Sequence, residues 1–137
     1  MPNVIDLIET DHREVEGLFA QFKEQPAKDL ALKVCEELDH HASAEEKVFY
    51  PVVREEVPDG KSLAGEGEEE HGEVRQLIGR IKQTDDLDHV TELVTELEQK
   101  VQHHVHEEES EMLPKSREAL GPDRLEELGA EFQAAKA

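Results

Sequence analysis

Two stretches of the sequence repeat one arrangement of histidine, glutamate and proline. The first is HHASAEEKVFYP, from His40 to Pro51, and the second is HHVHEEESEMLP, from His103 to Pro114. In both, two adjacent histidines are followed after three residues by two adjacent glutamates, and a proline closes the stretch. Imidazole nitrogens and carboxylate oxygens are suitable ligands for iron, manganese or zinc. The repetition therefore predicts metal chemistry, with one stretch for each of two ions.

Two further histidines lie in a second repeated pattern. DHREV (residues 11–15) and EHGEV (residues 70–74) share an acid, a His, any residue, a Glu and a Val. The chain is therefore a doubled unit, in which a helix with one His precedes a helix with His-x3-Glu-Glu and Pro. If a pseudo-twofold axis relates the two units, each half supplies two histidines and one glutamate. Such a set suits two equivalent metal ions.

The elements that position these residues are expected to be helices. Leu, Glu, Lys, Gln and Ala dominate the sequence, and strand-like alternation is absent. Breaks between helices are expected at residues 24–28, 58–62, 84–88 and 121–123. The expected helix N-caps are Asn3, Asp29, Ser62 and either Asp85 or Asp86. We predict an all-α fold, an antiparallel up-down four-helix bundle with a short fifth C-terminal helix.

Each long helix is predicted to turn one stripe of apolar residues, spaced by three and four, toward the core. One histidine interrupts each stripe, and a glutamate follows one turn later in the second and fourth helices. The six interrupting residues are His12, His41, Glu45, His71, His104 and Glu108. A carboxylate buried without partners is strongly destabilising, so these residues must be paired or bound to metal. We favour a dinuclear metal site over a purely structural polar core.

The neighbours of these residues lie off the core-facing stripe. His40 and His103 are about a third of a turn away from it, so we interpret them as flanking residues. For the same reason we expect the second glutamate of each stretch, Glu46 or Glu109, to matter much less for metal binding than the first.

Charge and composition exclude several classes of function. The 35 acidic and 15 basic residues give a formal charge of −20, which argues against nucleic acid and against anionic membrane surfaces as partners. Cys35 is the single cysteine, so no disulfide framework is expected and a reducing compartment fits. The start MPNVIDLIETDHREV lacks a leader pattern, and no stretch approaches about 20 apolar residues. We expect a cytoplasmic protein.

The length of the chain, 137 residues, is sufficient for one domain with its own core. We expect a single domain over residues 1–137. Within it, the bundle is predicted at about residues 3–114, and a C-terminal extension at about residues 115–137.

In these motifs the sequence resembles the hemerythrin-like family, the HHE cation-binding domain. DHREV, HASAEEKVFYP, EHGEV and HHVHEEESEMLP occur in the order that the family shows. The resemblance implies a non-haem di-iron centre inside a four-helix bundle, with two irons joined by an oxo or hydroxo bridge. It implies as ligands the six stripe residues named above, with Glu45 and Glu108 bridging the irons. The identification of iron rests on the family, and the residues alone leave manganese open.

The sequence departs from the oxygen-carrying members of the family at one position. Those members have a fifth histidine one turn after the histidine of the third helix, and Arg75 stands there in this chain. Arginine is permanently charged and cannot be a ligand. Two interpretations are open, an ion pair with an acid at the edge of the site or a plain surface residue. For Tyr50, the single tyrosine, we favour helix-end packing over a phenol turned toward the metals as ligand or hydrogen-bond donor.

The predicted ligand set has a functional consequence. Two roughly octahedral ions offer about twelve coordination positions, and the predicted ligands with one bridge leave about one exchangeable position on each ion. We therefore expect a di-iron protein that reacts with peroxide or other reactive oxygen or nitrogen species, in a protective role like that of a catalase or peroxidase. The alternative is a module that binds dioxygen, or senses iron or oxygen, without catalysis. Whether the chain is an enzyme stays open.

The expected partners are small molecules, namely dioxygen, peroxide or nitric oxide. No protein partner is predicted from the sequence. A third interpretation is a structural bundle whose polar stripe no longer binds metal.

Overall fold

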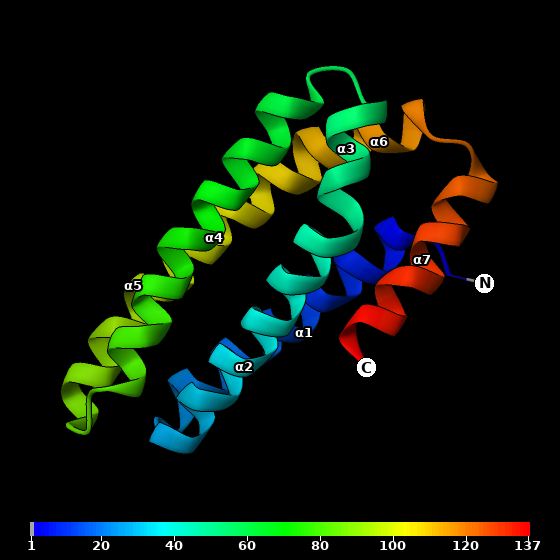
Figure 1. The fold of residues 1–137 in the computed structure, drawn as a ribbon. Helices are drawn as coiled ribbons and strands as arrows, with labels where there is room; N and C mark the ends of the chain where they lie inside the picture. The colour runs from blue at the N-terminus through cyan, green and yellow to red at the C-terminus, as the bar shows by residue number, and fades with distance from the viewer. Residues whose placement is uncertain (1) are drawn as a thin grey trace.

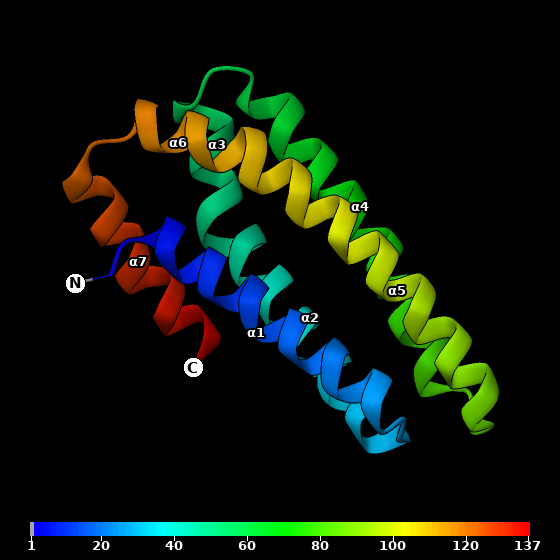
Figure 2. The same cartoon turned by 180° about the vertical axis from the view of Figure 1, so that it is seen from behind.

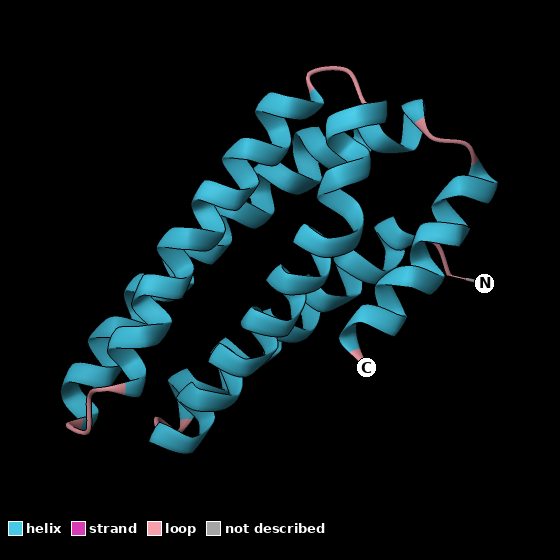
Figure 3. Ribbon diagram, viewed as in Figure 1, coloured by secondary structure: helices cyan, strands magenta, loops and turns pink. Residues whose placement is uncertain are grey.

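The computed structural model describes residues 2–137, and within them the chain forms five continuous helical segments and no strand (Figures 1 and 3). The first is α1 (Val4–Glu24). The second runs through α2 (Lys28–Ala44), the π-helical turn η1 (Glu45–Phe49) and α3 (Tyr50–Glu56). The remaining three are α4 (Gly60–Lys82), then α5 (Leu87–Glu107) with the π-helical turn η2 (Glu108–Met112) and α6 (Leu113–Ala119), and lastly α7 (Pro122–Lys136).

The arrangement of these segments confirms the predicted helical bundle with a short C-terminal helix. α1 packs against α2, and α4 packs against α5, as two pairs of long helices (Figures 1 and 2). α7 lies across the first pair, where it contacts α1, α2 and η1. None of the helices in the described chain is both long and apolar enough to cross a membrane.

Two of the predicted N-caps are confirmed. The side chain of Asn3 accepts a hydrogen bond from the backbone N–H of Asp6 at 2.9 Å. The side chain of Asp86 accepts one from the backbone N–H of His89 at 3.1 Å. Both bonds satisfy an N–H group of a first helical turn, which has no partner within its own helix.

The predictions of Asp29 and Ser62 as N-caps are wrong, because both residues lie inside helices. α2 already begins at Lys28, and α4 begins at Gly60. The early start of α4 depends on the absence of a side chain at Gly60, where a Cβ would lie 1.7 Å from the carbonyl oxygen of Val53. The chain can therefore turn from α3 into α4 earlier than the position of Ser62 suggests.

Two apolar clusters build the core, one on each side of the polar stripe residues. The first includes Phe19, Phe22 and Leu97. It fills the part of the bundle formed by the end of α1, the start of α2, the end of α4 and the start of α5. The second includes Phe49 and Phe132. It is formed by η1, α3, α6 and α7 together with the starts of α1 and α4. Along each long helix the predicted histidine falls between these clusters. The polar residues thus lie in the middle of the bundle rather than at an end.

Each repeated stretch contains a π-helical turn that begins at its first glutamate. The N–H of Tyr50 bonds to the carbonyl oxygen of Glu45, and the N–H of Leu113 bonds to that of Glu108. A proline follows each turn. Proline has no N–H, and its ring clashes with the carbonyl four residues earlier in an ordinary α-helix. The wider π-helical turn accommodates that ring, which explains why a proline closes both stretches.

The extra residue in the turn moves the core-facing stripe by one position. The spacing of three and four predicts Val48 and Val52 on the stripe after Glu45. Val48 is only half-buried, whereas Phe49 and Tyr50 are completely buried and Val52 remains buried. The prediction for Val48 is therefore wrong, and the π-helical turn places Tyr50 on the face that carries Glu45.

The contact between α7 and the start of α1 generates a prediction about stability. A Cβ at Gly129 would lie 2.4 Å from the carbonyl oxygen of Pro2 and 3.1 Å from the carbonyl carbon of Asn3. Because these are backbone atoms, Gly129→Ala should lower the free energy of unfolding by about 1–3 kcal/mol. At the exposed Gly72 of α4 an added Cβ meets nothing within 4 Å, so Gly72→Ala should raise it by about 0.5–1 kcal/mol. Urea unfolding measures the change in the free energy of unfolding for both variants. Equal changes would contradict the close contact of Gly129 with the start of α1.

Candidate metal centre

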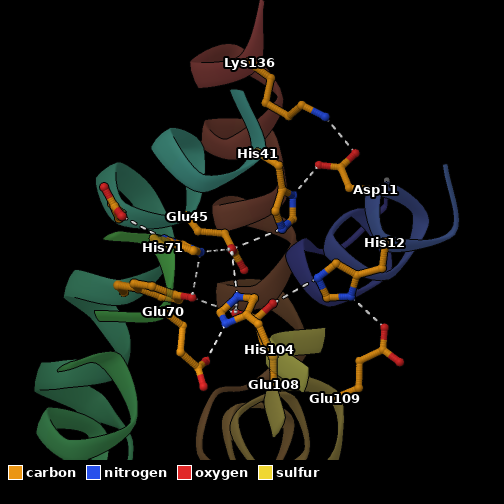
Figure 4. Close-up of polar contacts among 12 residues, drawn as sticks. Asp11, His12, His41, Glu45, Glu70, His71, His104, Glu108, Glu109 and Lys136 are labelled. Carbon is orange, nitrogen blue, oxygen red and sulfur yellow. Dashed lines mark hydrogen bonds and ion pairs between the residues drawn. The ribbon is translucent and has the colours of Figure 1, made fainter. Parts of the chain in front are cut away.

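The six predicted residues converge in the interior of the bundle (Figure 4). Glu45 is 0% exposed and Glu108 is 2% exposed, and all four histidines are buried. Ligand atoms of four of the residues lie within 4.8 Å of one another, and a second group of three is equally compact. The first group is His12, His41, Glu45 and Glu108, and the second is Glu45, His71 and His104. We call them the first and second ligand groups, and Glu45 belongs to both.

Five of the atoms that face the centre of the site lack hydrogen-bond partners. Nε2 of His12 lies 3.1 Å from Glu108 Oε1, and Nε2 of His41 lies 3.1 Å from Glu45 Oε1. These contacts are close, but they are not aligned as hydrogen bonds. Five buried atoms are consequently unpartnered: Nε2 of His12, His41 and His104, Oε2 of Glu45 and Oε1 of Glu108. Buried polar atoms are rarely left in this state, and metal ions would satisfy all five.

The outward-facing nitrogen of each histidine contacts a carboxylate. These Nδ1 atoms lie 2.6–2.7 Å from carboxylate oxygens, in the pairs His12–Glu109, His41–Asp11, His71–Glu46 and His104–Glu70. Nδ1–H donates in each pair, so Nε2 is the nitrogen directed into the site, and its lone pair binds metal once Nε2 is deprotonated. The four imidazoles are therefore held in the orientation that metal binding requires.

These four carboxylates are the functional residues that the sequence interpretation missed. Glu46 and Glu109 were expected to matter little, yet each orients a histidine of the opposite half of the chain. The signal was present, because an acid precedes His12 and His71 and each repeated stretch has a second glutamate. Since the pairs join different helices, their partners could not be assigned without the fold.

Three of the four outer carboxylates also contact a cation. Arg75 donates to both oxygens of Glu46 at 2.9 and 3.1 Å, so Arg75 forms an ion pair at the edge of the site, one of its two interpretations. The other two pairs are Lys136–Asp11 and Arg13–Glu109. The fourth carboxylate, Glu70, has no Lys or Arg partner within residues 2–137.

The flanking residues lie where the stripe predicts. His40 and His103 are exposed. Their neighbours His41 and His104 are the residues that point into the site.

Tyr50 is turned toward the site, which differs from the packing role that we favoured. It is completely buried, and its hydroxyl donates to Glu108 Oε2 at 2.7 Å and lies 3.4 Å from His71 Nε2. The ring stacks on His71 with a centroid separation of 5.3 Å. Gly67 provides the space, because a Cβ there would lie 2.6 Å from the hydroxyl. Burial, reinforced by Glu108, raises the pKa of Tyr50 well above its ordinary value, so the phenol stays protonated at neutral pH.

A small cavity adjoins the four histidines on the side of the first apolar cluster. Its volume is about 30 Å³. Apart from the histidines and Asp11, its walls are aliphatic side chains, those of Val15, Leu38, Ala42, Val74, Val101 and Val105. A cavity of this size holds one or two molecules as small as water, dioxygen or peroxide.

The charges of the metal-free site compensate one another. Burial, the largest single effect, would lower the pKa of His41, but the carboxylates of Glu45, Asp11 and Glu108 together raise this pKa to about 10. The pKa values of His12 and His104 are also raised: burial would lower them, but Glu108, with further contributions from Glu45, and from Glu70 at His104, more than offsets burial. Burial would raise the pKa of Glu45, but His41 holds it well below its ordinary value. Protonated imidazoles therefore neutralise the buried carboxylates when metal is absent.

This compensation predicts how the stability of the metal-free protein depends on pH. A histidine with a raised pKa in the folded state contributes stability that is fully present below its ordinary pKa of 6.5 and is lost as the pH rises toward the folded value. Chelator-treated protein should therefore unfold at lower urea concentration at about pH 8.5 than at about pH 6. Burial raises the pKa of the Cys35 thiol from 9.0 to about 11, so ionisation of this thiol in the unfolded chain adds a smaller loss of stability in the same direction at the upper end of the range. A midpoint that is constant or rises with pH would contradict this account.

Comparison with known proteins gives three results. The sequence profile of a family described as "Hemerythrin HHE cation binding domain" matches residues 3–116. A protein of a Nostoc species named "DNA nickase" is 31% identical over 144 aligned residues, which cover 98% of this chain and 39% of the relative. The chain thus spans about two-fifths of the length of this relative. No solved structure matches the chain.

Proposed function

Because the chain belongs to the family of hemerythrin HHE cation-binding domains, we propose that it is a non-haem di-iron protein that reacts with peroxide or other reactive oxygen and nitrogen species. The observation that carries the proposal is the convergence of two ligand groups that share Glu45, with five unpartnered atoms facing one another. The choice of iron over manganese rests on the family, since the same residues suit both metals.

The side chains around the site support chemistry on a small substrate. Bound iron supplies electron transfer and coordination positions at which an oxygen species can bind. The hydroxyl of Tyr50 is a protonated donor between Glu108 and His71, so it can donate a hydrogen bond or a proton in the site. The cavity beside the four histidines admits molecules of the size of peroxide and excludes larger ones.

The position of Arg75 favours reaction over storage of dioxygen. Arg75 lies one turn after His71, but its guanidinium contacts Glu46 outside the ligand groups. Each half of the chain therefore contributes two histidines, and neither ion receives a third. An oxygen carrier needs one saturated ion so that dioxygen binds only at the other, whereas two open ions favour redox turnover.

The name of the Nostoc relative does not lead us to propose cleavage of DNA for this chain. The chain covers 39% of that protein, so the named activity is not assigned to the shared part. A formal charge of −20 also opposes binding to the phosphate backbone.

The proposal predicts two bound metals per chain and a graded response to substitution. Glu45→Ala should abolish binding of the pair, because both ligand groups use this carboxylate. Glu46→Gln should weaken binding by about 10–100-fold through the loss of orientation of His71, with two metals still bound at saturation. His41→Ala should lose iron, because it removes a ligand of the first group. His40→Ala changes the neighbouring exposed histidine and serves as the matched control that should retain iron. Elemental analysis after iron loading measures the outcome, and two irons per chain in Glu45→Ala would show that the assignment is wrong.

The proposal also predicts consumption of peroxide. Iron-loaded protein should remove hydrogen peroxide, followed by absorbance at 240 nm. Tyr50→Phe should slow the removal by about 10–100-fold, because this change removes only the hydroxyl that donates to Glu108. The iron content of the variant serves as the control. If wild-type protein with two irons leaves peroxide untouched and takes up dioxygen reversibly, the alternative of a dioxygen-binding module replaces this proposal.

A further inference from the structure

The two halves of the chain share their ligands but differ on one face of the site. Superposition of the repeated motifs, His12 on His71 and His41 on His104, brings the flanking residues of the two halves into correspondence. On this face the first half is mostly apolar and the second half is mostly acidic. The corresponding pairs are Leu7 and Glu66, Ile8 and Gly67, Asp11 and Glu70, Ala44 and Glu107, and Val48 and Glu111.

α7 closes this face in the first half. It packs on α1, α2 and η1. The ring of Phe132 contacts the His41 imidazole edge to face at a centroid distance of 6.0 Å. Lys136 forms an ion pair with Asp11 at 2.7 Å (Figure 4). The approach to the ligands of the first half is therefore blocked by a helix and by a positive charge.

In the second half the same face is a narrow cleft between α4 and the segment formed by α5 and η2. Glu66, Glu107 and Glu111 line the cleft together with Glu70. His104 and Glu108 also line it, and both have buried atoms without a hydrogen-bond partner. The volume of the cleft is about 10 Å³, which is about the space of one water molecule or ion. The cleft thus joins an acidic mouth to the atoms that are left unpartnered in the site.

The negative charge at this mouth is not neutralised. Within residues 2–137, none of Glu66, Glu107 and Glu111 forms an ion pair with Lys or Arg. The adjacent outer carboxylate, Glu70, contacts His103 and His104 instead of Lys or Arg. The other three outer carboxylates each contact Lys or Arg, so positive charge lies near the remaining approaches to the site. A cation is therefore attracted more strongly to the cleft than to the approaches where Lys or Arg offsets the carboxylate charge.

We propose that divalent cations reach the two ligand groups through this cleft, and that Glu70, His103 and Glu107 bind the cation at its mouth before it passes inward. His103 Nε2 lies 3.1 Å from Glu107 Oε1 and 3.5 Å from Glu70 Oε2, and the three ligand atoms fall within 4.8 Å of one another. Glu70 also holds Nδ1 of His104 at 2.6 Å, which connects the mouth directly to the second ligand group. The inference rests on the proposed function, because it presupposes that metal fills the ligand groups.

The test compares rates of metal uptake in two variants that lose the same charge. The cleft variant is Glu66→Gln, Glu107→Gln and Glu111→Gln, which leaves both ligand groups and Glu70 intact. The control variant, Glu14→Gln, Glu36→Gln and Glu55→Gln, changes three exposed carboxylates away from the cleft. Co²⁺ is mixed with chelator-treated protein, and its visible absorption follows uptake in time. The amount bound at the end is measured by elemental analysis.

The cleft variant should take up Co²⁺ about tenfold more slowly than wild type, and the control variant should match wild type. Both should bind two ions at the end. Raising the ionic strength should slow uptake by wild type more than by the cleft variant, because screening weakens attraction only where charge remains. His103→Ala should also slow uptake without reducing the final amount.

Three results would overturn the inference. They are a cleft variant as fast as wild type, a control variant that is slowed equally, and uptake by wild type that does not respond to salt. A His103→Ala variant as fast as wild type would remove the binding step at the mouth. Failure of wild type to bind two ions would instead contradict the proposed function, so the two failures are distinguishable.

Discussion

Burial of two carboxylates in the middle of a helical bundle is the constraint on which the structure depends. Glu45 and Glu108 have lost nearly all contact with water, and an uncompensated charge in that position would destabilise the fold strongly. Imidazoles supply the compensation: those of His12, His41 and His104 are protonated in the metal-free protein, and all four are positioned as co-ligands once metal is bound. The bundle is thus built to hold positive charge at its centre, whether protons or metal ions provide it.

The outer carboxylates continue this compensation of charge toward the surface. Each histidine is held between an inner and an outer carboxylate, and three of the outer ones meet Lys or Arg. Charge therefore alternates in shells from the centre outward, which limits the electrostatic cost of each shell. Glu70 is the exception, and its side of the site is the one that opens into the acidic cleft. The two halves repeat the same helices, but α7 covers this face of the site in the first half, whereas the cleft leaves it open in the second.

The fold and the inner residues could be predicted from sequence because both depend on local spacing. Steps of three and four place His41 and Glu45 on one face of a helix, and the position of the apolar stripe separates His41 from His40. The π-helical turns could not be predicted by counting, since they break that spacing, and Val48 was misplaced for this reason. The contact of His41 with Asp11 joins two separate helices, so it could not be predicted without knowing how the helices pack.

The two π-helical turns also make the ligand groups inequivalent. Tyr50 and Leu113 occupy the same position after their glutamates, and both are buried. Only Tyr50 brings a hydroxyl, which donates to Glu108 of the first ligand group and lies 3.4 Å from His71 of the second. Two ions bound here would therefore differ in reduction potential although their ligands match in type. If both ions are iron, as we propose, the additional electron of a mixed-valence pair would be localised on one ion rather than shared.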